Sequence, residues 1–208
     1  MDFKIRIITA FYFGLLLFFL GSCKNSVYNP KPRTYPKIVF PEKSYTRVSS
    51  GTCPFSFEAP LYSKLEKDST FFNDKIENDC WFNLVFPGFN GSLYCSYFPI
   101  QNPKELEKHI KDAYKLVREH HVKADFIDEF PILKSNKIFG MIYSIEGPSA
   151  SPFQFYLTDS AQHFLRGSLY FNSRTNPDSL APILNFVRID LSHLINTFEW
   201  TVKKEQKK

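Results

Sequence analysis

The sequence lacks the short motifs that mark common enzyme and metal sites. Its four cysteines include no Cys-x-x-Cys pair and no His/Cys ligand spacing, which argues against a structural zinc site and a thioredoxin-like redox motif. It also has no glycine-rich phosphate-binding loop and no Gly-x-Ser-x-Gly nucleophile elbow. No internal repeat is evident, and the net charge of +5 is only mildly basic. None of these common catalytic or metal-binding motifs therefore indicates a function for this protein.

The sequence has one long hydrophobic run, and it is too short for a permanent membrane span. Lys4 and Arg6 precede apolar residues 7–20, about 14 residues where a spanning helix needs roughly 20. This profile is typical of a signal peptide. The run ends in Leu20-Gly21-Ser22-Cys23, which resembles the lipobox of bacterial lipoproteins. We therefore expect residues 1–22 to be removed and Cys23 to be the lipid attachment site, with an ordinary secretory signal or short anchor as the alternative.

The residues after Cys23 are predicted to form a tether. Residues 24–43 contain four prolines and few apolar side chains, so they cannot bury enough surface to fold alone. About 20 extended residues at roughly 3.1 Å each would reach on the order of 60 Å. We expect a lipidated, proline-rich tether over residues 23–50, one folded domain over residues 51–202 and a solvated basic tail over residues 203–208. Export would also exclude nucleic acid as a partner.

An odd number of cysteines remains once Cys23 carries lipid. Cys80 and Cys95 lie on two predicted strands, residues 80–86 and 91–97, which residues 87–90 join as a hairpin. Pairing Phe86 with Gly91 gives an apolar face and sets the two cysteines diagonally, so a bridge between them would need distortion. Buried free thiols for Cys53, Cys80 and Cys95 are the preferred interpretation, with a disulfide left open.

Helix signals are clear at two places in the domain. Asn102 is a predicted N-cap, followed by Pro103 in the first helical position and by Glu105 in position for a capping box. The apolar face of this helix is Leu106, Ile110, Ala113, Val117 and Ala124. A second helix is predicted to begin with Asp178 as its N-cap and Pro182 in its first turn. Its apolar stripe is Leu180, Ile183, Val187, Leu191, Leu194 and Phe198.

Strand patterns surround these helices. Alternating or apolar runs over residues 54–58, 138–145, 152–157 and 163–171 add to the hairpin, and the last three read as an antiparallel meander. Such a pattern predicts an α+β domain in which two main helices cover an antiparallel sheet. The order of these elements is similar to the PsbP/Mog1-like sandwich, a fold that implies binding or assembly without fixing a function.

Several segments together resemble the gliding-motility lipoprotein GldD family of the Bacteroidetes. They are residues 35–38, 41–45, 53–58, 80–84, 154–160, 163–172, 177–180 and 198–200. The resemblance implies a non-enzymatic accessory part of the gliding machinery, connected with type IX secretion, which contacts other envelope proteins. In that phylum surface-displayed lipoproteins often carry acidic residues just after the cysteine, and residues 24–27 have none. We therefore expect a periplasm-facing anchor.

The strongest catalytic candidates are Asp159, Ser160, His163 and Arg166, because Ser, His and Asp can form a nucleophile, a base and an orienting group. On a continuous strand Asp159 and His163 would lie about 13 Å apart, at roughly 3.3 Å per residue, with Ser160 on the other face. The preferred interpretation is structural: turn residues bonded to backbone amides, and an arginine paired on the sheet face. A periplasmic hydrolase or small-ligand-binding lipoprotein that uses residues 159–166 is the alternative function. His109, His120 and His121 are expected to be solvated helix residues, and we predict no metal or cofactor.

Overall fold

The computed structural model describes residues 37–67, 70–71, 74–75, 78–173 and 176–201. The predicted signal segment, Cys23, the first half of the predicted tether and the basic tail lie outside these residues. From Ile38 onward the described chain forms one compact unit. None of its described helices is both long enough and apolar enough to cross a membrane.

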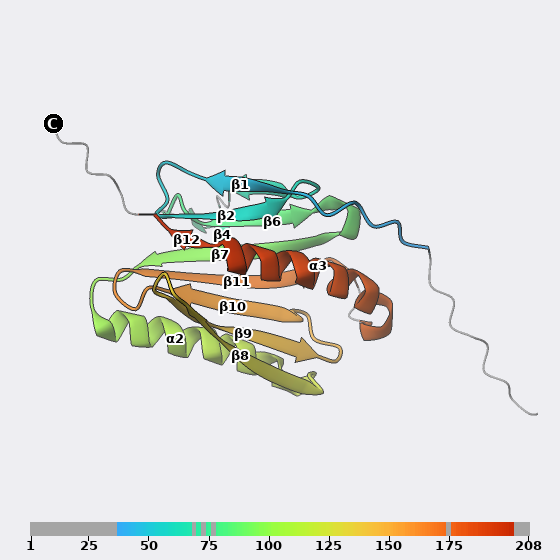
Figure 1. Ribbon diagram of the computed structural model, residues 1–208. Helices are drawn as coiled ribbons and strands as arrows, with labels where there is room; N and C mark the ends of the chain where they lie inside the picture. The colour runs from blue at the N-terminus through green and yellow to red at the C-terminus, as the bar shows by residue number, and fades with distance from the viewer. Residues whose placement is uncertain (1–36, 68–69, 72–73, 76–77, 174–175, 202–208) are drawn as a thin grey trace, which may run out of the picture. The chain divides into compact units, whose positions relative to one another are not determined.

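A seven-stranded antiparallel sheet forms the centre of this unit (Figure 1). In spatial order its strands are β3 (Lys64–Lys67), β6 (Phe82–Phe86), β7 (Gly91–Pro99), β11 (His163–Phe171), β10 (Phe153–Thr158), β9 (Ile138–Glu146) and β8 (Phe126–Lys134). The predicted hairpin is confirmed, with Phe86 opposite Gly91 and Phe82 opposite Cys95. The short 3₁₀ helix η1 (Pro87–Phe89) forms its turn.

A second, three-stranded sheet consists of β1 (Tyr45–Ser49), β2 (Phe55–Pro60) and β12 (Glu199–Trp200), in the order β1-β2-β12. Strand β1 lies within the segment predicted as tether, so the folded part begins before Gly51. It was not predicted because its side chains are mostly exposed and do not alternate between apolar and polar. A short pair, β4 (Thr70–Phe71) and β5 (Asp74–Lys75), follows β3.

Helix α2 (Pro103–Arg118) begins as predicted. The Asn102 side chain accepts a hydrogen bond from the Glu105 N–H at 3.1 Å, and the Glu105 carboxylate accepts one from the Gln101 N–H at 2.9 Å. The helix ends before Ala124, because the 3₁₀ helix η2 (Glu119–Val122) continues it. Ala124 still packs against the apolar cluster around Val117.

Helix α3 (Pro177–Thr197) begins two residues earlier than predicted. Its N-cap is Asn176, whose side chain accepts from the Ser179 N–H, and Pro177 occupies the first helical position. The prediction of Asp178 as N-cap was therefore wrong. Asn and Asp both cap helices, and here the side-chain oxygen of Asn176 is the one that reaches an N–H group of the first turn. Pro182 consequently lies inside the helix rather than in its first turn.

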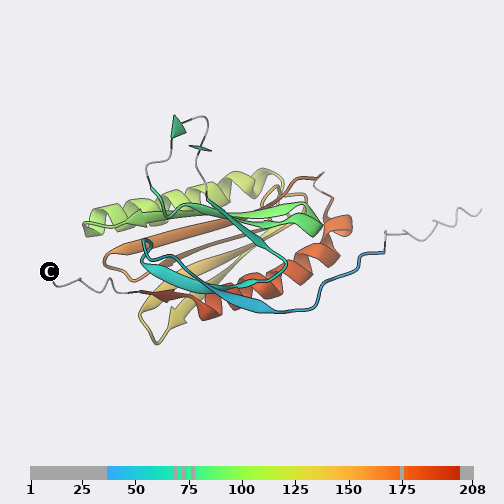
Figure 2. The same ribbon diagram turned by 90° about the horizontal axis from the view of Figure 1, so that it is seen from above.

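The two helices lie on opposite faces of the large sheet (Figure 2). Side chains of β11 alternate between these faces: Phe164 packs in the cluster with Ala113 of α2, whereas Leu165 belongs to the main core with Val187 and Leu191 of α3. The small sheet joins α3 on the main-core face, where Phe55 of β2 stacks near Phe198. The predicted α+β class, with helices covering an antiparallel sheet, is therefore confirmed.

The cysteines differ from the preferred prediction. Cys53 and Cys80 form a disulfide, and Cys95 is a buried free cysteine. The sequence argument compared only cysteines of one hairpin, and it correctly set Cys80 and Cys95 apart. The partner of Cys80 comes instead from the loop before β2, which the folding of the small sheet against β6 brings near.

Candidate functional site

The Asp159 carboxylate is used by the turn between β10 and β11. Its Oδ1 accepts hydrogen bonds from the backbone N–H groups of Ala161, Gln162 and His163 at 2.9, 2.8 and 2.9 Å. Burial would raise the pKa of this carboxyl, but the three amide hydrogen bonds outweigh it and hold the pKa below its usual value. Asp159 is thus a turn-forming anion, as the structural interpretation predicted.

Ser160 and His163 face different partners. Ser160 has φ of 64°, and its N–H donates to Thr158 Oγ1 at 3.0 Å. His163 Nδ1 lies 2.8 Å from the Tyr97 hydroxyl, and its ring stacks on Trp200 with centroids 5.0 Å apart. Burial lowers the pKa of His163. In the described structure no hydrogen bond joins the Ser160 and His163 side chains, so the turn brings the residues near without forming a nucleophile–base pair.

Arg166 lies on the sheet face that α2 partly covers. Its Nη2 donates to Ser168 Oγ at 3.0 Å and to Gln154 Oε1 at 3.4 Å. Burial lowers the pKa of the guanidinium. The arginine is therefore bonded to its own strand and to the adjacent β10, and the four predicted candidates do not converge on one point.

The three histidines of the α2–η2 region have three environments. His109 stacks on Phe98 with centroids 4.4 Å apart, so the prediction of a fully solvated ring was wrong for this residue. His120 is half-buried, and burial followed by the charge of Arg166 lowers its pKa. His121 is exposed. Within the described ranges, no group of three or more His, Cys, Asp or Glu side chains could hold a metal ion.

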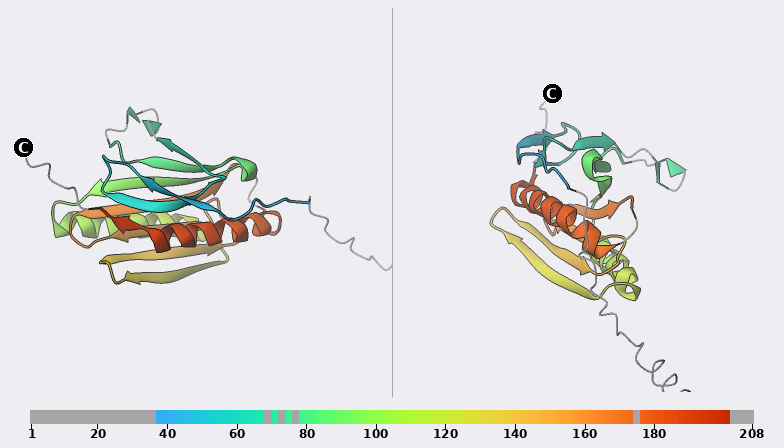
Figure 3. Two further views of the ribbon diagram at one scale, coloured as in Figure 1. Left: turned by 45° about the horizontal axis from the view of Figure 1, so that its top comes forward. Right: turned by 90° about the vertical axis from the view of Figure 1, so that its right-hand side faces the viewer.

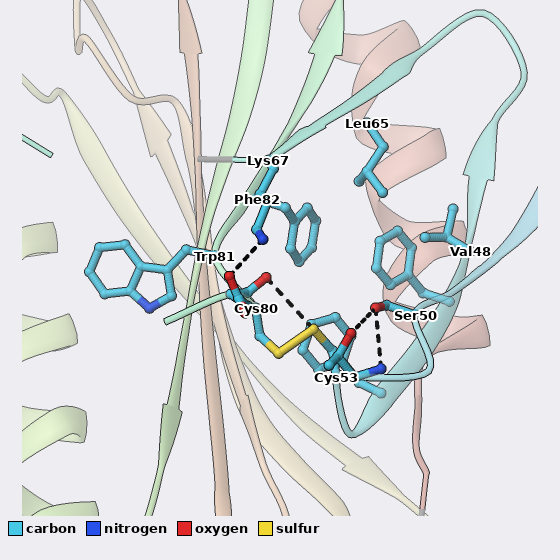
Figure 4. A pocket seen from close by; sticks show the side chains of 12 residues that line it. Val48, Ser50, Cys53, Leu65, Lys67, Cys80, Trp81 and Phe82 are labelled. Atoms are coloured by element: carbon cyan, nitrogen blue, oxygen red, sulfur yellow. Dashed lines mark hydrogen bonds and ion pairs between the residues drawn. A yellow bond between two sulfur atoms is a disulfide. The ribbon is translucent and has the colours of Figure 1, made fainter. Parts of the chain in front are cut away.

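A pocket of about 310 Å³ lies beside the disulfide (Figure 4). It opens between the small sheet and the β3–β6 edge of the large sheet. Its lining is Val48, Ser50, Thr52, Cys53, Phe55, Phe57, Leu65, Lys67, Asp79, Cys80, Trp81 and Phe82. The lining is mostly apolar, with polar groups that include an exposed ion pair between Lys67 and Asp79 at 2.6 Å. This pocket can accept an apolar group, and its lining includes none of the residues predicted as catalytic.

Asp190 is a buried charged residue that the sequence analysis did not single out. It is fully buried on α3, where its carboxylate accepts from Lys43 Nζ at 2.6 Å, from the Tyr45 hydroxyl at 2.8 Å and from the Tyr62 hydroxyl. Burial and the bond to Asp190 raise the pKa of Tyr45 to about 12. A sequence signal existed, because an aspartate lies within the apolar stripe of the second helix. This cluster fixes onto α3 a segment, Lys43 to Tyr45, that was predicted to belong to the tether.

Residues 25–200 match the family model described as gliding motility lipoprotein GldD. The chain belongs to the GldD family. The match extends from two residues beyond Cys23 to the end of β12 and includes all the described strands and helices between them. The GldD family predicted from the sequence is thus confirmed.

Comparison with other proteins adds little to that assignment. A solved structure, the solution structure of cyanobacterial PsbP (CyanoP) from Synechocystis sp. PCC 6803, is similar over 87% of this GldD-family chain and 98% of its own, at 11% identity and a TM-score of 0.45. No curated protein matches the chain.

Proposed function

We propose that this GldD-family lipoprotein is a membrane-anchored, non-enzymatic accessory component of the gliding-motility and type IX secretion machinery. It would act through protein–protein contacts in the cell envelope, with other gliding or secretion proteins as partners and no nucleic acid. The observation that carries the proposal is the family match over residues 25–200. The structural use of Asp159, His163 and Arg166 agrees with a non-catalytic role.

We further propose that Cys23 carries the lipid and that the domain faces the periplasm. The tether is then shorter than predicted, since Phe40 already stacks on Phe186 and Lys43 is bonded to Asp190. About 15 extended residues between Cys23 and Ile38, at roughly 3.1 Å each, would reach on the order of 45 Å. A domain on such a tether would contact envelope partners up to that distance from the membrane. The contacts of Phe40 and Lys43 with α3 fix the point where the tether joins the domain.

A clean deletion tests the assembly role. Cells without the protein should fail to spread on surfaces and should secrete less type IX cargo, and a plasmid copy of the wild type should restore both. Spreading and secretion at wild-type levels in the deletion strain would refute the proposal.

A further inference from the structure

Exposed apolar side chains concentrate at one border of the large sheet. On η2, β8 and the start of β9 they are Val122, Phe126, Phe130, Leu133 and Phe139. Phe126 is 69% exposed and Leu133 is 77% exposed, values unusual for residues within a sheet. Scattered exposed apolar residues need no explanation, but here they gather along one edge strand, with Phe126 and Phe130 on one face of β8 and Leu133 on the other.

Strand β8 is an open edge. It has nine residues, longer than the usual five to six, and in the described part of the chain it pairs with β9 alone. The end-on view in Figure 3 shows the yellow β8–β9 hairpin at the outer border of the sheet. At the end of β8, Lys134 donates to the backbone carbonyls of Ile195, Asn196 and Phe198 at the end of α3. An edge of this kind presents unpaired N–H and C=O groups to which another strand can bond.

The centre of β8 is acidic and contains a proline. Asp128, Glu129 and Pro131 are all exposed, and no ion pair of either acid occurs in the described structure. Pro131 removes one backbone donor, which limits unspecific pairing along the edge. The two carboxylates favour a partner strand that carries Lys or Arg, because opposite charges across a strand pair stabilise it and like charges destabilise it.

The same charges disfavour two other occupants. A lipid surface would have to desolvate Asp128 and Glu129 between Phe126 and Phe130, and anionic lipids would repel them. A second copy paired across the acidic centre of β8 would bring like charges together. The mixed acidic and apolar edge fits neither.

From this edge we propose that β8 binds an extended segment of another envelope protein, with Lys or Arg between apolar residues, as an eighth strand of the sheet. Backbone hydrogen bonds would supply much of the affinity, and Phe126, Phe130 and Leu133 would contact the apolar side chains. The proposal rests on the proposed role in protein–protein contact and names the surface that makes it.

The first test uses the mature protein in detergent and a peptide in which valine and lysine alternate. We expect this peptide to shift the backbone amide resonances of β8, and a valine–glutamate peptide of equal length to shift none of them. Asp128 and Glu129 point to opposite faces of β8, so the lysines of the peptide contact whichever acid shares their face. Asp128→Lys combined with Glu129→Lys should therefore weaken binding of the lysine peptide by about tenfold or more, since the opposite-charge contact becomes repulsive on either face. Absence of β8 shifts, or equal binding of both peptides, would overturn the proposal.

The second test places the same double variant in cells. Asp112→Lys combined with Glu66→Lys is the matched control, because it reverses two exposed acids on α2 and on β3, the strand at the opposite edge of the sheet from β8. With equal unfolding midpoints, we expect the β8 variant to lose spreading and the control to retain it. Equal spreading of cells with the two variants would count against the role of β8. A deletion strain with no spreading defect would refute only the proposed function, because the peptide measurement would still decide whether β8 binds a strand.

Discussion

Ser160 shows, for a single residue, how a group suited to catalysis can be set by the backbone instead. Its φ of 64° lies in the left-handed region, which an L-residue adopts at some cost and which glycine adopts freely. The conformation lets Asp159 accept three consecutive amide hydrogen bonds. The turn therefore gives a structural reason for Asp, Ser and His to occur close together in the sequence.

Replacement of Ser160 by glycine tests this explanation. Ser160→Gly deletes the hydroxyl but suits the backbone, so we expect an unchanged or slightly higher unfolding midpoint and normal spreading of cells. Asp159→Ala is the contrasting variant, which should lower stability by about 1–3 kcal/mol because three backbone amides lose their charged acceptor. Loss of spreading in a fully folded Ser160→Gly protein would instead support the hydrolase alternative.

The half-buried histidines give the domain a defined pH dependence. Burial lowers the pKa of His109, His120 and His163 from the ordinary value of 6.5, so the unfolded chain binds these protons more readily than the folded one. Their contribution to stability is complete above pH 6.5 and is lost as the pH falls through the lower folded-state pKa values. We expect urea midpoints to fall as the pH drops below 6.5, and His163→Gln to reduce that slope. A midpoint independent of pH from 7.5 to 5 would contradict this account.

The disulfide joins two elements that are distant in the chain. It links the loop before β2 to the residues before β6, a sequence separation of 27. Closing a loop of that length in the unfolded chain predicts a stabilisation of about 3.5 kcal/mol, so Cys53→Ser with Cys80→Ser should lower the free energy of unfolding by about that amount. Chemical denaturation measures the loss. Thiol titration of the unfolded wild type should find Cys95 reactive and Cys53 and Cys80 unreactive until a reductant is added.

Asp190 holds a segment against α3 in the same way. Lys43 donates to the Asp190 carboxylate and to the Phe186 carbonyl, and its ammonium lies 3.4 Å from the Phe186 ring centroid. Asp190→Ala would leave Lys43 and two tyrosine hydroxyls without their acceptor, and we expect a loss of about 3–5 kcal/mol. Limited proteolysis should then cut the chain before β1. Ser192→Ala, at an exposed position of the same helix, is the control, and equal sensitivity of both variants would contradict a specific role of Asp190 in holding this segment.

Elements with a strong local signal were predictable from the sequence. The hairpin register follows from its apolar alternation, and the start of α2 follows from Asn102, Pro103 and Glu105. The edge strands β1, β3 and β8 were not, because edge strands keep most side chains exposed and lose the alternation that marks a strand. Pro131 is also a residue type that is depleted in strands, although proline is tolerated at a sheet edge.

For the whole molecule, fold class and family were predictable, whereas long-range pairs were not. The contacts of Asp190 with Lys43 and of Cys53 with Cys80 join segments whose proximity depends on how the small sheet packs. Local sequence patterns carry no information about such distances. The preferred interpretation of Asp159 and Ser160 as turn residues bonded to backbone amides was available from the sequence, and the structure adds which amides Asp159 accepts from: those of Ala161, Gln162 and His163.

At this scale the remaining prediction concerns attachment. Phe40 and Lys43, near the start of the described domain, are held on α3 by contacts within the domain. We therefore expect its fold not to depend on a lipid at Cys23. Cys23→Ser should move the protein from the membrane fraction to the soluble periplasmic fraction while the unfolding midpoint of the domain stays the same. One acyl chain gives marginal membrane binding and several give stable anchoring, so the shift should be nearly complete if Cys23 carries the lipid.

The same variant separates attachment from contact. If partners are reached from the membrane, Cys23→Ser cells should spread poorly although β8 and the disulfide are intact, because the local concentration of the domain at the envelope surface falls. Fusion of the variant to an unrelated membrane-spanning helix should restore spreading. Membrane retention of Cys23→Ser would show that attachment does not depend on this cysteine, and normal spreading of a fully released domain would show that the partner contact alone suffices.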